Sequence, residues 1–177
     1  MKVIIAAPYI YDYPTILSFL AMYKVKNIAK EMGYDVIFLP LDAASPIGYF
    51  LRHSEADIVL YGGHGTPISI VGQWLVWHMI SAINDKVMFV DGKTFICIPT
   101  CLPARRIGPL TIKNGARGFM GSEDYMWAAA GPLLPEYKGY NYAADFVDTW
   151  ISVHVAFLRT LDLYKAYKTY RDLCEHY

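Results

Sequence analysis

Residues 57–67, DIVLYGGHGTP, join a probable buried strand to an unusual ending. The apolar run is short and continuous, which is typical of a parallel strand covered on both faces. It ends in Gly-Gly-His-Gly, so His64 stands among three glycines where the strand should stop. Residues 94–104, TFICIPTCLPA, repeat this design with an apolar run followed by Cys101. The sequence therefore predicts that His64 and Cys101 each follow a buried strand.

Strand-like and helix-like segments alternate along the chain. We expect main strands over residues 2–7, 34–40, 56–62, 94–98 and 116–121, and a small extra strand at 87–90. We expect helices over residues 14–32 and 72–83, a short helix or turn over 45–56, and a helix over 103–115 that is broken or kinked near Gly108. We expect a long aromatic loop at 122–141 and one or two amphipathic helices over 142–177. Such alternation predicts an α/β fold: a three-layer α/β/α sandwich with a mainly parallel sheet, forming a single domain over residues 1–177.

Composition narrows the class of protein. The 177 residues are 55% apolar and 18% charged, with sixteen acids and sixteen bases, which is typical of a globular chain. The absence of a basic block argues against nucleic-acid binding, and no apolar run reaches the roughly 20 residues that span a bilayer. Three cysteines without framework spacing favour a reducing compartment, so we expect a cytoplasmic protein.

The ends of the two strands carry the chemistry. Ligands of open α/β sheets bind at the carboxyl ends of the strands, which places His64 and Cys101 at one edge. A thiolate that attacks a carbonyl carbon, with an imidazole to move protons, performs acyl transfer. The oxyanion that forms needs backbone N–H donors, and those of Gly65 and Cys101 are the natural candidates.

The two stretches 57–67 and 94–104 together resemble the caspase-like cysteine peptidases, which include caspases, legumain, separase and the gingipains. Two further stretches are similar to the gingipain-like members: NGARGFMGSEDYMWA (114–128) and the terminal TLDLYKAYKTY (160–170). The resemblance implies a cysteine endopeptidase, with Cys101 as nucleophile and His64 as general acid/base, acting on a peptide or protein substrate. The alternative is a catalytically inactive caspase-like domain that binds a protein partner. A homo-oligomer is compatible with either.

Three acids are expected near this edge: Asp12 after the first strand, and Glu123 and Asp124 after the fifth. A carboxylate in the substrate pocket would favour arginine or lysine before the cleaved bond. Trp127 is a candidate wall of that pocket. The adjacent pair Arg105 and Arg106 offers the opposite preference, for an acidic residue, if it turns inward.

Other motifs give weaker signals. Cys97 lies within a strand and is predicted to be a core residue. The four remaining histidines have no partner cysteine and no convincing metal-ligand spacing, so neither a metal nor a cofactor is predicted. They are His53, His78, His154 and His176. The GGHG stretch is no phosphate loop, and no G-x-S-x-G nucleophile elbow is present.

Overall fold

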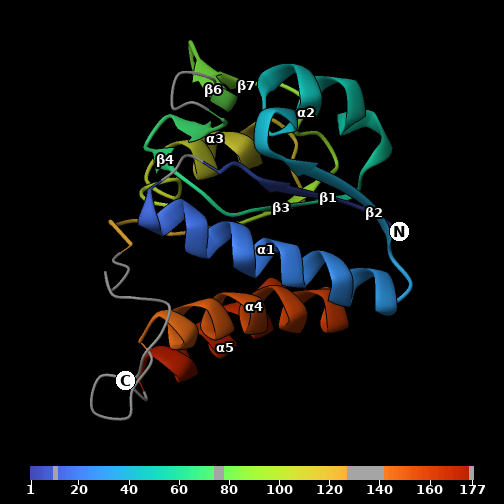
Figure 1. The fold of residues 1–177 in the computed structure, drawn as a ribbon. Helices are drawn as coiled ribbons and strands as arrows, with labels where there is room; N and C mark the ends of the chain where they lie inside the picture. The colour runs from blue at the N-terminus through green and yellow to red at the C-terminus, as the bar shows by residue number, and fades with distance from the viewer. Residues whose placement is uncertain (10–11, 74–77, 127–141, 176–177) are drawn as a thin grey trace.

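The structure is a computed structural model that describes residues 1–9, 12–73, 78–126 and 142–175. Its centre is a sheet of parallel strands in the order β2-β1-β3-β8-β9 (Figure 1). These strands are β1 (Lys2–Ala7), β2 (Asp35–Pro40), β3 (Ile58–Tyr61), β8 (Thr94–Cys97) and β9 (Gly118–Gly121). All four pairings between them are parallel. The predicted α/β class and mainly parallel sheet are therefore confirmed.

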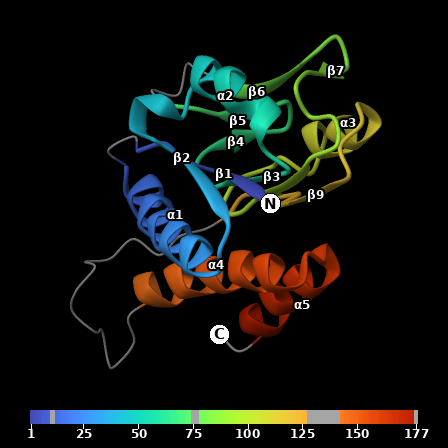
Figure 2. The same cartoon turned by 90° about the vertical axis from the view of Figure 1, so that its right-hand side faces the viewer.

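Helices cover both faces of this sheet (Figure 2). One face carries α1 (Tyr13–Glu31) and α4 (Tyr142–Thr160), with α5 (Leu163–Cys174) beyond them. The other face carries α2 (Pro46–Arg52) and α3 (Ile107–Lys113). Two short 3-10 helices and four further strands complete the order.

Side chains alternate between the two faces of β1, as the pleat of a strand requires. Val3 and Ile5 contribute to the hydrophobic core under α1 and α4, whereas Ile4 and Ala6 contribute to the core on the opposite face. All four side chains are fully buried. Burial on both faces explains why the strands read as continuous apolar runs in the sequence.

The first helix has clear start and stop signals. Asp12 is its N-cap, and the Oδ1 atom of Asp12 accepts a hydrogen bond from the Thr15 N–H at 2.8 Å. Pro14 occupies the first turn, where the missing N–H costs nothing. Gly33 follows the helix with a φ of +85°, a conformation that favours glycine. These signals fix where α1 begins, and thereby the position of Asp12 at the carboxyl end of β1.

A second, antiparallel sheet lies over the face that carries α2 and α3, in the order β4-β5-β6-β7. Its strands are β4 (Gly65–Thr66), β5 (Ser69–Val71), β6 (His78–Ile83) and β7 (Lys86–Val87). The predicted helix over residues 72–83 is therefore wrong, because residues 78–83 are a strand. Asn84 and Asp85 both have positive φ and join β6 to β7 in a two-residue hairpin turn.

Two other local predictions need correction. The expected strand at 87–90 is shorter and earlier, since β7 ends at Val87. The expected helix over 103–115 begins only at Ile107, after a series of turns. Two short 3-10 helices, Leu41–Ala43 and His53–Glu55, flank α2. The predicted aromatic loop falls largely on residues 127–141, which lie outside the described residues.

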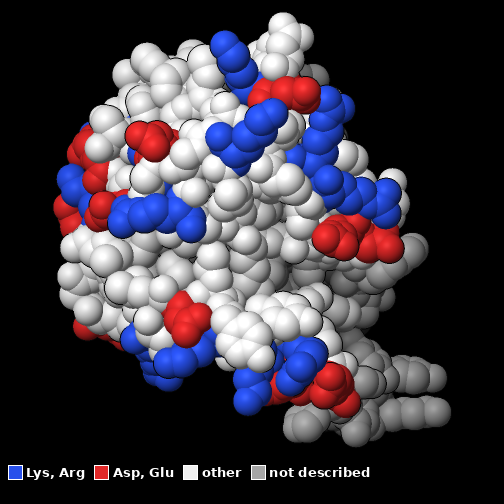
Figure 3. All heavy atoms as spheres, turned by 180° about the vertical axis from the view of Figure 1, so that it is seen from behind, with Lys and Arg blue, Asp and Glu red and all other residues white. Residues whose placement is uncertain are grey.

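Charged side chains of both signs are interspersed over the face seen in Figure 3, the side opposite to that of Figure 1. Neither lysine and arginine nor aspartate and glutamate form a continuous block among the described residues of that face. None of the helices in the described ranges combines the length and the apolarity needed to cross a bilayer.

Candidate active site

The connections from β1 and from β3 leave the sheet on opposite faces. The chain after β1 enters α1 on one face, and the chain after β3 enters the antiparallel sheet on the other. Because β1 and β3 are neighbours, their carboxyl ends border a crevice at the point where the strand order reverses. This is the position at which open α/β sheets bind their ligands.

Asp12 and His64 meet across this crevice, although 52 residues separate them in the sequence. The Nε2 atom of His64 lies 2.7 Å from the Oδ2 atom of Asp12. Burial alone would raise the pKa of Asp12, but hydrogen bonds from His64 and Thr15 outweigh it and hold the pKa below its usual range. Asp12 thus presents an ionised carboxylate to the imidazole, and that hydrogen bond fixes the orientation of the ring.

The backbone of His64 is also held in place. Its carbonyl accepts hydrogen bonds from the Tyr61 hydroxyl at 2.8 Å and from the Val71 N–H at 3.1 Å. The N–H of Gly63 donates to the Pro99 carbonyl at 2.9 Å, which joins the loop after β3 to the loop after β8. Both backbone and ring of His64 are therefore positioned by named partners.

Gly65 brings the His64 loop against Cys101. A Cβ atom at position 65 would lie 2.7 Å from the Cys101 carbonyl oxygen and would also overlap the Thr100 methyl group. Only glycine permits this approach of the two backbones. The predicted meeting of the two loops at one edge of the sheet is thus present in the structure.

Gly65 also orients its N–H. Because Val71 donates to His64, residues 64 and 71 form a hydrogen-bonded pair of the β4–β5 hairpin, and the next pair, Gly65 with Ile70, is not hydrogen-bonded. The N–H of Gly65 therefore points away from β5 rather than into the ladder.

Cys101 contacts the backbone of Met126. The Met126 N–H donates to Sγ of Cys101 at 3.3 Å, and Sγ lies 3.9 Å from the Met126 carbonyl oxygen. The Thr100 N–H donates to the Met126 sulfur at 3.2 Å. Leu102, next in sequence, has a φ of +64° and donates its N–H to the Asp124 carbonyl. These contacts hold the Cys101 loop against the segment that follows β9.

His64 and Cys101 line one small pocket of about 80 Å³. The first turns of α1 contribute Thr15 and Ser18 to its wall, and α4 contributes Trp150. Thr15, Ser18 and Trp150 are almost fully buried, whereas Cys101 is partly exposed. Cys101 therefore lies at the boundary between solvent and this small pocket.

The acids predicted after the fifth strand, Glu123 and Asp124, are exposed. Asp124 is paired with Arg105 at 3.5 Å, and its side chain is 78% exposed. The backbone carbonyl of Glu123 accepts a hydrogen bond from Arg105, and neither acid lines the pocket. Arg106 forms an ion pair with Asp85 at 2.8 Å. Trp127 lies outside the described residues.

Sequence reasoning did not identify two residues that contact the candidate pair. Tyr61 and Met126 hold the two candidate residues through backbone contacts that no local pattern indicates. Asp12 was expected near the edge as a substrate-binding acid, but the structure bonds it to His64. Cys97 is fully buried, as predicted, and burial raises the pKa of its thiol.

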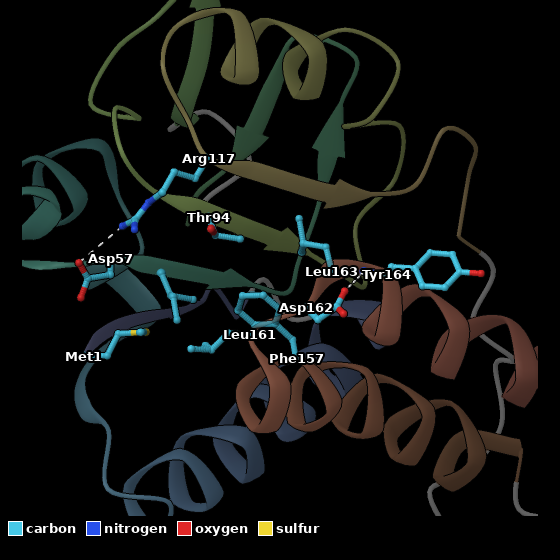
Figure 4. Close-up of a pocket in the computed structure, with 10 residues that line it drawn as sticks. Met1, Asp57, Thr94, Arg117, Phe157, Leu161, Asp162, Leu163 and Tyr164 are labelled. Atoms are coloured by element: carbon cyan, nitrogen blue, oxygen red, sulfur yellow. Dashed lines mark hydrogen bonds and ion pairs between the residues drawn. The ribbon is translucent and has the colours of Figure 1, made fainter.

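A larger pocket of about 860 Å³ lies at the opposite, amino-terminal edge of the sheet (Figure 4). An ion pair of 3.7 Å between Arg117 and Asp57 forms one side, and Phe157 and Leu163 form part of an apolar floor. Its lining residues include no histidine or cysteine. His64 and Cys101 line the smaller pocket at the carboxyl edge instead.

Within the described ranges, no three side chains of His, Cys, Asp and Glu form a group that fits a metal ion. Comparisons of the chain with protein-family models, with curated proteins and with solved structures find no match.

Proposed function

We propose that the chain is a cysteine peptidase of the caspase-like type, with Cys101 as nucleophile and His64 as general acid/base. One observation carries the proposal: His64, hydrogen-bonded to the carboxylate of Asp12, lines the same pocket as Cys101. The three residues follow three neighbouring strands, β1, β3 and β8. A nucleophile, a base and a group that orients the base are the components of nucleophilic hydrolysis.

The proposed reaction has two half-reactions. The thiolate of Cys101 attacks the carbonyl carbon of a peptide bond, and the charge moves to the carbonyl oxygen. His64 then gives a proton to the leaving amine as the carbon–nitrogen bond breaks, which leaves an acyl group on sulfur. A water molecule gives a proton to His64 and attacks this thioester, which releases the acid and restores the thiolate.

The polar groups around the pair suit these steps. Since Nε2 of His64 is bonded to Asp12, Nδ1 is the nitrogen that exchanges the proton. The N–H of Gly65, directed away from β5, and that of Cys101 are the proposed donors to the oxyanion. In this scheme Asp12 is a positioning residue that fixes the tautomer and the orientation of the imidazole.

The alternative, a non-catalytic domain that binds a partner, also has a supporting observation. Large apolar side chains are exposed on α2 and near the β6–β7 hairpin, notably Ile47 at 71%, Leu51 at 64% and Met88 at 59%. Exposed apolar groups are common at interaction surfaces. This alternative does not require a reactive thiol, so thiol reactivity separates the two proposals.

Alkylation by iodoacetamide at pH 7 is the deciding experiment. Under the proposed mechanism, Cys101 is expected to react about tenfold faster than the more exposed Cys174, because His64 lines the same pocket as Cys101 and serves as its base. Site-resolved mass spectrometry gives both rates from one sample, so Cys174 is the internal control. His64→Ala should remove the difference. If Cys101 reacts no faster than Cys174 in the parent chain, the catalytic proposal fails.

Asp12 can be tested separately from its role as a helix cap. Asp12→Asn retains a good N-cap but loses the charge, and Asp12→Ala loses both. Asn is expected to lower kcat by roughly tenfold to a hundredfold, with stability nearly unchanged, because the loss should be smaller than that of a general base. Ala should add a loss of about 1 kcal/mol in unfolding free energy. Equal kcat in Asp12→Asn and the parent would remove Asp12 from the mechanism.

A further inference from the structure

We infer that the candidate site accepts a small, uncharged residue, such as alanine or serine, immediately before the cleaved bond. This inference rests on the proposed function, since it concerns the group that would be attached to the attacked carbonyl. An acyl group bound to Sγ of Cys101 extends into the space beside that sulfur. The pocket lined by both Cys101 and His64 is the hollow that the described residues place there.

The size of the pocket limits the side chain that enters. Its volume of about 80 Å³ is roughly half of a 150 Å³ protein cavity that accommodates benzene. Trp150, only 2% exposed, and Ser18, 1% exposed, are buried parts of its wall. Because packed side chains of this kind do not move aside without cost, leucine, phenylalanine and arginine are too large for the pocket.

The chemistry of the lining excludes charge. Among the described residues, His64 is the one member of the lining that can carry a positive charge, and no Lys, Arg, Asp or Glu joins it. The Ser18 hydroxyl donates its proton to the Thr15 carbonyl at 3.1 Å, and the Thr100 hydroxyl donates to the Pro99 carbonyl at 2.7 Å. An aspartate side chain in the pocket would thus lose its hydrating water, and these hydroxyl protons, already donated to carbonyls, would not replace it. An arginine side chain would have no carboxylate partner among the lining residues. The methyl group of alanine and the hydroxymethyl group of serine carry no charge, so neither of these desolvation penalties applies to them.

The carboxylates that would favour arginine or lysine are placed elsewhere. Asp12 holds the imidazole of His64, and Asp124 is paired with Arg105 in solvent. Glu123 is exposed and is not part of the pocket lining. Among the described residues, the acids near this edge therefore give no support for a basic residue in the pocket.

The test uses peptidyl chloromethyl ketones that differ only in the residue next to the ketone: alanine, leucine, arginine or aspartate. Each rate of Cys101 modification, measured by mass spectrometry, is divided by the rate of the same reagent with glutathione. Alanine is expected to exceed each of the other three by about tenfold or more, since a single misfitting methylene already costs that much. Reaction fastest with the arginine, aspartate or leucine reagent overturns the inference.

Two variants report on the pocket itself. Met126→Ala keeps the backbone N–H and enlarges the pocket. It should therefore reduce the ratio of the alanine rate to the leucine rate severalfold. Met79→Ala removes a buried methionine on β6 that does not line this pocket, and it should leave the ratio unchanged. An unchanged ratio in folded Met126→Ala contradicts the inference; if this variant does not fold, the parent's four rates decide.

Iodoacetamide distinguishes failure of the specificity from failure of the function. If His64-dependent alkylation of Cys101 persists but another reagent exceeds alanine, the pocket assignment is wrong and the nucleophile assignment stands. If alkylation is independent of His64 and no chloromethyl ketone is favoured, the proposed function and this inference both fail.

Discussion

Cys101→Ala is expected to abolish peptide hydrolysis while leaving the fold intact. The sulfur forms the only covalent bond between enzyme and substrate in the proposed reaction, and alanine has no group to replace it. Removal of a nucleophile of this kind costs roughly 10⁴-fold or more in kcat. Cys101 belongs to neither hydrophobic core and is partly exposed, so its loss should change stability little.

Turnover of a peptide reporter and circular dichroism together check this result. Cys174→Ala is the matched control, because it removes an exposed thiol far from the site in sequence and should retain full activity. His64→Ala should lower kcat by about 10² to 10⁴, the range that general acid/base catalysis contributes. A Cys101→Ala variant that cleaves as fast as the parent would show that another group is the nucleophile.

The second large effect concerns acid stability and originates at His154 in α4. This side chain is fully buried, and its Nδ1 lies 2.7 Å from the Trp150 carbonyl, which makes Nδ1 the protonated nitrogen. Nε2 is buried without a hydrogen-bond partner in the described structure. Burial lowers the pKa of His154 from 6.5 to about 4, against the opposing effect of the Trp150 carbonyl.

The unfolded chain therefore binds a proton at His154 at higher pH than the folded chain does. The stability associated with neutral His154 is fully present above pH 6.5 and is lost as the pH falls from 6.5 to 4. The expected loss is about 3 kcal/mol of unfolding free energy, a substantial fraction of the stability of an ordinary domain.

Urea unfolding at a series of pH values measures this loss. His154→Leu should flatten the dependence between pH 6.5 and 4, whatever its effect at neutral pH. His78→Gln, which alters an exposed histidine at the start of β6, should leave the dependence unchanged. An equally steep loss in His154→Leu would assign the acid sensitivity to other groups.

The parallel sheet was predictable because burial on both faces leaves a direct mark on the sequence: uninterrupted apolar runs such as residues 2–7. The same logic placed His64 and Cys101 at one edge, since parallel strands end together. The segment 78–83 was misassigned because its apolar residues also fit a helical spacing. The turn at Asn84 and Asp85, a two-residue hairpin connection, was the signal that favours strands there.

The detailed site was less accessible to sequence reasoning. A carboxylate after β1 was visible, but its partner is set by tertiary packing, and only the structure bonds Asp12 to His64. Likewise, the size of the pocket depends on Trp150, which lies in α4, in the C-terminal part of the sequence. Contacts of this kind join distant segments and leave no local periodicity or spacing to read.

The order in which the site residues are synthesised has a biological consequence if the proposed function holds. A ribosome that has completed β5 has made Asp12 and His64 but not yet Cys101. After Cys101 is added, β8 must still pair with β3 before the thiol reaches the imidazole. A growing chain therefore cannot cleave its neighbours on the same polysome. The proposed active site forms only after four of the five strands of the parallel sheet have paired.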